Sequence, residues 1–215
     1  MTRDDTAGTV PPAADAPRVG VALIGGHPVL DFANTVAWRT DDARRADRVG
    51  GAGAWIRWAG AAGVFPTART KALLDAVSRE DPADLLSGLA GLRALRTAVS
   101  AVLDAAVDGT PPPTEAWETV RRCLLTAHRE AELPPALPMR WHARADRFAD
   151  LTHALALQAG DLLAGPPVER VRRCQGPGCG WFFLDRSRNG TRRWCSSGDC
   201  GNRDRVRRHY RRSRG

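Results

Sequence analysis

Two pairs of cysteines near the C-terminus constrain the fold of this chain more than any other feature. Each pair has four residues between its members and fifteen residues separate the pairs; the members are Cys174, Cys179, Cys195 and Cys200. Two short loops that each carry two thiolates suit a tetrahedral zinc ion, with Zn–S distances of about 2.3 Å. Disulfides in a secreted protein, or an iron–sulfur or redox role, are the alternatives. A fifth cysteine, Cys123, leaves an odd thiol, and the first residues lack the apolar run of a secretory signal, so we expect one structural Zn²⁺.

The segments around the cysteines predict a hairpin followed by a helix. Residues 181–184 and 191–194 flank a polar segment that ends in Asn189-Gly190, which is typical of a β-hairpin. Residues 201–212 have helical character, and Val206 and Tyr210 lie four residues apart, so we expect both to pack back against the cysteine loops. Arginines at the same spacing repel one another along this helix. We therefore expect an anionic partner.

The stretch from Cys174 to Arg203 resembles the CGNR zinc finger, a family named for the tetrad Cys200-Gly201-Asn202-Arg203. The neighbouring words LDRS and RRWC match as well. The resemblance implies that the four paired cysteines are the metal ligands. It also implies a small treble-clef-like site built from knuckle, hairpin and helix, and the binding of DNA or RNA in a bacterial regulator.

Positive charge gathers in the same part of the chain. Residues 168–215 hold fourteen arginines and four acidic residues, a formal net charge of +10, whereas the other residues carry a net charge of −2. Guanidinium groups bind phosphates and guanine edges in a way that lysine does not. A solvated basic tail is the alternative, and a membrane surface is disfavoured because the helix lacks a wide apolar face. We expect contacts to nucleic acid from Arg186, Arg188, Arg192, Arg193, Arg203, Arg205, Arg207, Arg208 and Arg211.

The rest of the chain predicts a helix-rich domain. Residues 1–18 are expected to be a disordered leader, 19–167 the domain, and 168–215 the finger, with the boundary after Gly165-Pro166-Pro167. A short strand over 21–24 and a helix over 29–38 open the domain. The longest apolar periodicity runs from Asp81-Pro82 to Gly109 and predicts a core helix; further helices are expected over 51–64, 67–77, 114–127 and 146–163. The expected fold class is α+β, with a predominantly helical N-terminal domain and a small zinc finger.

The word GGHPVLDFANT, residues 25–35, resembles the opening of the ABATE domain, a family of stress-induced transcription regulators usually found ahead of the CGNR finger. The resemblance implies an unidentified ligand. Asp31 and Asn34 are the polar members of the word and lie three residues apart on one predicted helix face, so they are the candidates for ligand contact. The alternative is a buried polar pair that ties neighbouring loops together.

The sequence favours binding over catalysis. It has no nucleophile elbow, no P-loop and no metal-binding histidine pattern, and a four-thiolate zinc has no open coordination position, so we expect no enzyme. No apolar run approaches the roughly 20 residues of a membrane span, and reduced thiols indicate the cytoplasm.

We expect a zinc-dependent nucleic-acid-binding protein, with DNA favoured over RNA, acting as a transcription regulator whose N-terminal domain serves sensing or dimerisation. An RNA- or ribosome-binding zinc-ribbon protein and a zinc-stabilised protein-interaction adaptor are the alternatives. Exposed aromatic rings at Trp181, Phe182 or Trp194 would favour single-stranded RNA, whereas buried rings would favour a duplex. A homodimer and a small-molecule ligand stay open.

Overall fold

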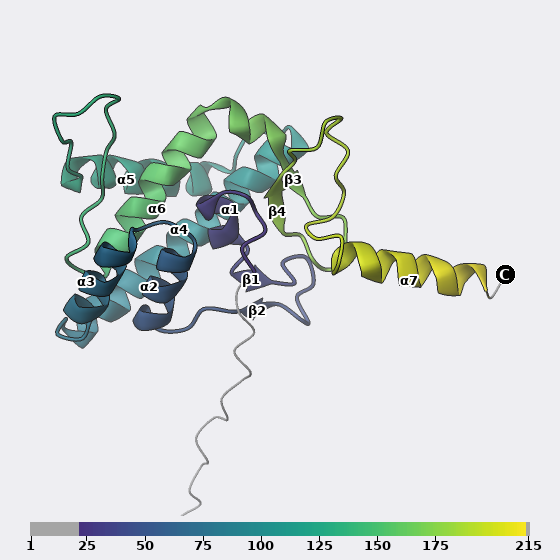
Figure 1. The fold of residues 1–215 in the computed structure, drawn as a ribbon, viewed down its shortest axis with the longest axis horizontal. Coiled ribbons are helices and arrows are strands. Elements are labelled where there is room, and N and C mark those ends of the chain that lie inside the picture. Colours follow the sequence, from purple (N-terminus) through teal and green to yellow (C-terminus); the bar gives the residue numbers. More distant parts are fainter. Residues whose placement is uncertain (1–21, 214–215) are drawn as a thin grey trace, which may run out of the picture.

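The computed structural model describes residues 22–213, so the expected leader lies outside the described residues. The body of the protein is helical and a small finger follows it (Figure 1). The elements of the body are α1 (Pro28–Ala33), β1 (Val36–Ala37), β2 (Ala46–Asp47), α2 (Ala52–Ala61), α3 (Thr67–Val77), α4 (Pro82–Asp108), α5 (Thr114–Glu130) and α6 (Ala149–Ala164). A 3-10 turn (Pro166–Arg170) leads to the elements of the finger, which are β3 (Val171–Arg173), β4 (Phe182–Leu184) and α7 (Cys200–Arg212).

Helix α4 is the centre of the body and packs against both α5 and α6. It begins where the Asp81 carboxylate accepts a hydrogen bond of 2.7 Å from the N–H of Ala83, and it ends at Gly109, whose φ of 67° suits glycine. Its apolar stripe, which includes Leu92, Leu95, Val99 and Val102, is buried. By length and composition alone α4 could cross a membrane, a test that buried core helices also pass. In the fold this apolar stripe faces the protein core.

An aromatic cluster joins α1 to α2. The ring of Phe32 contacts those of Trp55 and Trp58, with centroids 5.6 Å and 6.0 Å away, and the two indoles meet edge to face at 5.4 Å. Burial of each ring contributes about 2 kcal/mol to stability. The two tryptophans are therefore core residues.

The finger shares the core of the body. Strands β3 and β4 are antiparallel, with Val171 opposite Leu184, and both residues join Phe182 in the main hydrophobic core. Strand β3 contacts α4, and β4 contacts α1. The fold class expected from the sequence, a mostly helical N-terminal region followed by a small hairpin and a helix, is confirmed.

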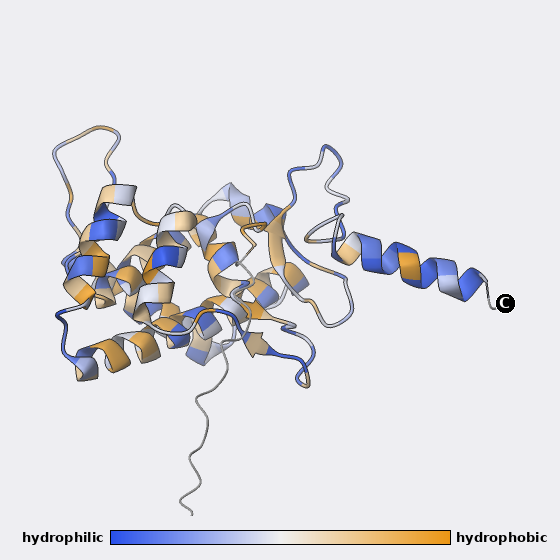
Figure 2. Ribbon diagram, turned by 60° about the horizontal axis from the view of Figure 1, so that its bottom comes forward, coloured by the Kyte–Doolittle hydropathy of each residue, from blue (hydrophilic) through white to orange (hydrophobic). Residues whose placement is uncertain are grey.

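Four local predictions are wrong. Residues 22–24 form no strand, and α1 ends at Ala33 because the chain turns into β1. Strand β4 pairs with β3 across the first cysteine loop, and residues 191–194 form no strand. Val206 and Tyr210 are 46 % and 63 % exposed, because α7 runs away from the body into solvent instead of folding back (Figure 1). Figure 2 shows the same helix as largely hydrophilic along its length.

Candidate metal centre and the helix it anchors

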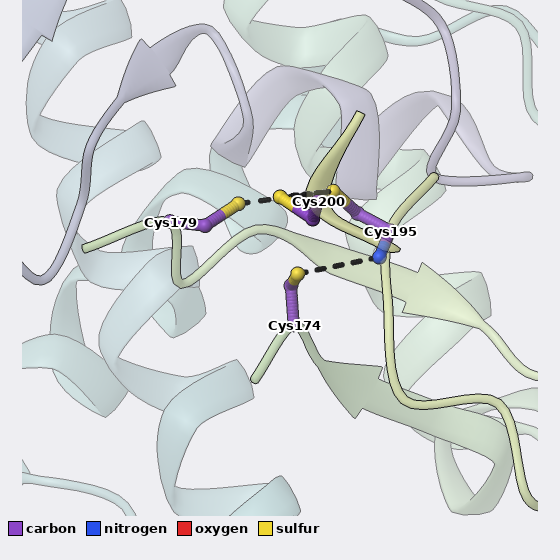
Figure 3. Close-up of side chains that lie close together, drawn as sticks. All are labelled: Cys174, Cys179, Cys195 and Cys200. Carbon is purple, nitrogen blue, oxygen red and sulfur yellow. Dashed lines mark hydrogen bonds between the residues drawn. The ribbon is translucent and has the colours of Figure 1, made fainter. Parts of the chain in front are cut away.

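The four cysteines meet at one buried point (Figure 3). All four Sγ atoms lie within 4.8 Å of one another, with 3.7 Å between Cys179 and Cys195 and 3.6 Å between Cys195 and Cys200. Four sulfurs that each lie 2.3 Å from a tetrahedral ion are about 3.8 Å apart, so the cluster has the size that zinc requires. The four cysteines together can hold one zinc ion.

The backbone brings each pair into place. Cys174 directly follows β3 and Cys179 lies shortly before β4, so the first pair occupies the turn of the hairpin. A Cβ at Gly176 would lie 3.0 Å from the Sγ of Cys200, which explains why this position has no side chain. Cys200 is the first residue of α7, so a metal bound by the four cysteines would fix the start of that helix.

The thiols cannot all ionise without a cation. Hydrogen bonds from Cys179 and Cys195 lower the pKa of Cys174 to about 2, and backbone N–H groups of Gly176 and Cys195 add to this at 3.4 Å and 3.3 Å. The same hydrogen bonds to Cys174 raise the pKa of Cys179 to about 12 and raise the pKa of Cys195 as well. A divalent ion would let all four thiols ionise, because it stabilises every thiolate at once. Zinc binding would thus release protons and weaken as the pH falls.

The last residue of the CGNR tetrad acts at the metal centre. One guanidinium nitrogen of Arg203 donates to the Sγ of Cys200 at 2.9 Å. Four thiolates around Zn²⁺ carry a net charge of −2, which a neighbouring cation partly offsets. The same guanidinium lies over the ring of Trp38, 4.7 Å from its centroid. Arg203 therefore connects the metal ligands to the body.

Side chains of the body hold the finger strand in place. The buried amide of Asn34 donates to the carbonyl oxygen of Phe182 and accepts from its N–H, both at 2.8 Å. The indole N–H of Trp181 donates to the carbonyl oxygen of Val36 at 2.8 Å. The carboxylate of Asp31 accepts from the N–H of Gly25 at 2.8 Å, although burial raises its pKa. The two candidate ligand residues thus make buried contacts to backbone groups.

The arginines of the hairpin region differ in their surroundings. Arg192 turns inward, where its guanidinium donates to the carbonyl oxygens of Trp194 and Cys195 and lies over the ring of Phe183. Arg193 is exposed and donates to the side chain of Gln175, and Arg186 is exposed and donates to the carbonyl oxygen of Gly26. Arg188 is exposed.

The arginines of α7 mostly face solvent. Asp204 is buried at the base of the helix and pairs with Arg207 and Arg208, at 2.6 Å and 2.9 Å. Arg205 reaches the carbonyl oxygen of Ser197 at 3.2 Å, and Arg211 is exposed. Within α7 the buried residues are Cys200, Gly201 and Asp204, so the helix is held only at its first turns.

Sequence reasoning missed the contacts that the body makes with the finger. The loop between β1 and β2, residues 38–45 (the β1–β2 loop), lies against the first cysteine pair. Arg173 of β3 pairs with Asp104 and Asp108 of α4, at 2.8 Å and 2.7 Å. Neither contact has a local sequence signature, since the partners are more than sixty residues apart. The sequence feature that could have indicated the Arg173 contact is the pair of acidic residues near the end of α4, Asp104 and Asp108.

Family comparisons agree with both resemblances. The model of the CGNR zinc finger matches residues 170–213. A second model, described as "Putative stress-induced transcription regulator" and named ABATE, matches residues 26–166. A search of curated proteins finds no match. The chain belongs to the ABATE family and carries a CGNR zinc finger C-terminal to its ABATE domain.

Proposed function

We propose that this protein is a cytoplasmic transcription regulator that binds duplex DNA through α7, with a structural zinc ion held by Cys174, Cys179, Cys195 and Cys200. The observation that carries the proposal is the projection of α7 from the body into solvent (Figure 1). The helix has 13 residues, and a helix of that length spans about 20 Å. Such a rod can enter a groove without a clash between the groove walls and the body.

The surface of α7 favours an anionic groove as its partner. Its exposed arginines point in several directions around the helix, and like charges at this spacing destabilise an isolated helix. A short helix with few tertiary contacts is marginal in water by itself. Phosphates on both sides of a groove would relieve the repulsion. Before DNA binds, the metal would keep the start of the helix in place.

Two features favour duplex DNA over RNA. The major groove of B-form DNA, about 12 Å wide, admits an α-helix, whereas the major groove of A-form RNA is too deep and narrow. Trp181 and Phe182 are 8 % and 0 % exposed, and Trp194 is partly buried beneath Arg193, so the finger offers little aromatic surface for stacking unpaired bases.

We assign sensing or dimerisation to the helical body. The assignment is to binding and not to catalysis, because four thiolates leave zinc no open position.

The groups on α7 with most exposure define the interface we propose. Arg205, Arg208, Arg211 and Arg212 extend into solvent, together with Arg188 and Arg193 of the finger loops. Arg186, which donates to the carbonyl oxygen of Gly26, and the half-buried Arg207 are not counted in this interface. Arg192 and Arg203, which the sequence also suggested, are left out of it because they hold the second cysteine loop and the metal ligand.

The test is fluorescence anisotropy with a 20-base-pair DNA duplex, the matching RNA duplex and the single strands, over a range of salt concentrations. About five phosphate contacts predict a plot of log affinity against log salt with a slope near −4.5 for duplex DNA. Replacement of Arg205, Arg208, Arg211 and Arg212 by Gln should weaken binding by more than tenfold, because most of these contacts are lost.

The control removes as much charge from the body. Four exposed arginines serve for this control, Arg57 on α2, Arg79 just after α3, and Arg122 and Arg129 on α5. Their replacement by Gln should leave binding unchanged. Stronger binding to RNA would favour the RNA alternative. Equal losses in both variants, or a slope near zero at measurable affinity, would overturn the proposal.

A further inference from the structure

The β1–β2 loop belongs to the body, yet it is fixed beside the metal centre. The backbone N–H groups of Arg39 and Thr40 donate to the carbonyl oxygens of Cys179 and Gly178, at 3.1 Å and 3.3 Å. The guanidinium of Arg39 also donates to the carbonyl oxygen of Gly180 at 2.6 Å and to Asp104 at 2.9 Å. The loop therefore has one defined position relative to the finger.

The loop also touches the first turn of α7. The guanidinium of Arg44 lies over the ring of Trp38, 3.9 Å from its centroid, and that of Arg203 lies over the same ring at 4.7 Å. Trp38 has a φ of 54°, in the left-handed region that residues other than glycine rarely adopt. Such strain persists where the surroundings fix it, here the contacts to both arginines and the cysteine loop. One indole thus contacts both a cation of the body and a cation of α7.

Two guanidinium groups of this loop face solvent. Arg44 is exposed and its ion pair with Asp41 is a surface pair, which contributes little to stability. Arg45 is exposed, and no hydrogen bond or ion pair involving its side chain is found among residues 22–213. The loop, residues 38–45, holds three arginines and two acidic residues, a formal net charge of +1, next to the positively charged finger.

The β1–β2 loop lies where a groove-bound α7 would bring it close to DNA phosphates. If α7 lies in the major groove, its first turn sits at the edge of the groove, and the sugar–phosphate backbone of one strand runs along that edge. The β1–β2 loop stands beside this first turn. We propose that Arg44 and Arg45 bind phosphate groups of the DNA strand that borders the groove occupied by α7, an inference that rests on the proposed function. The body would then set the register of α7 along the duplex.

The test measures salt dependence with the full chain and the 20-base-pair duplex. The variant Arg44→Gln with Arg45→Gln should bind with a slope that is less steep by about 1.8, because two phosphate contacts are lost. Arg45→Gln alone should reduce the slope by about half as much. Arg45 does not stack on Trp38, so this second variant reports on phosphate contact without disturbing the loop.

A matched control lies on α5. Arg121 forms an exposed i,i+3 ion pair with Glu118, as Arg44 does with Asp41, and its neighbour Arg122 is exposed like Arg45. Arg121→Gln with Arg122→Gln should leave the slope unchanged. Lysine at positions 44 and 45 should restore the slope because charge is retained, whereas a purely structural role through the Trp38 stack would not be restored by lysine.

The outcomes separate this inference from the proposed function. An unchanged slope in the Arg44→Gln, Arg45→Gln variant, with binding still lost when the α7 arginines are replaced, would overturn the inference and leave the proposed function intact. No binding of the unaltered protein to the duplex at low salt would overturn both. Zinc content and circular dichroism of each variant identify any change caused by unfolding.

Discussion

At the scale of single residues, the finger depends on Asn34 of the body and on Arg203 of α7 as well as on its cysteines. Asn34 satisfies both backbone groups of Phe182, and Arg203 donates to the Sγ of Cys200. The cysteine cluster could be predicted because short loops fix the position of both thiols of a pair. The role of Asn34 could not, because its partner lies 148 residues away and only the fold brings the two together.

Replacement of Asn34 tests this buried contact. Asn34→Ala leaves the N–H and the carbonyl oxygen of Phe182 without partners in the core, so we expect the free energy of unfolding to fall by about 3 kcal/mol. Urea unfolding measured with zinc bound gives the value. Asn189→Ala, at an exposed loop position, is the control and should change stability by less than about 0.5 kcal/mol. A similar small change in Asn34→Ala would contradict the structural role of this amide.

At the scale of elements, helices with local end signals were predictable and strand pairing was not. Helix α3 begins and ends where its pattern predicted, and α4 is bounded by the Asp81 cap and Gly109. The partner of β4 was missed because the nearest β-prone run, residues 191–194, does not pair with it, whereas β3, on the other side of the first cysteine loop, does. The burial of Val206 and Tyr210 was wrongly expected because periodicity shows that a helix has an apolar side without showing that anything covers it.

The exposure of α7 predicts its dynamics. No residue of α7 beyond Asp204 is buried, so amide hydrogens of residues 205–212 should exchange quickly in the free protein. Saturating duplex DNA should slow this exchange at least tenfold, while amides in α4 should change little. Hydrogen–deuterium exchange followed by mass spectrometry resolves these peptides. Strong protection of α7 without DNA would mean that the helix is stable by itself and would contradict its stabilisation by DNA.

At the scale of the whole molecule, the finger and the body form one structure. Val171, Phe182 and Leu184 of the hairpin lie in the core of the body, and Arg39 and Arg173 tie the finger to Asp104 of α4. The finger is therefore fixed to the body by packing and hydrogen bonds. This rigid connection could not be foreseen from the composition break at Gly165-Pro166-Pro167.

The central claim is that zinc held by four cysteines presents α7 to duplex DNA. The most direct measurement compares zinc content and DNA affinity of the unaltered protein and of Cys195→Ser, with Cys123→Ser as the control because Cys123 lies on α5 outside the cluster. We expect one zinc per chain and salt-dependent DNA binding in the unaltered protein and the control, and loss of both in Cys195→Ser. Full zinc retention in Cys195→Ser, or unchanged DNA affinity after zinc is lost, would contradict the claim.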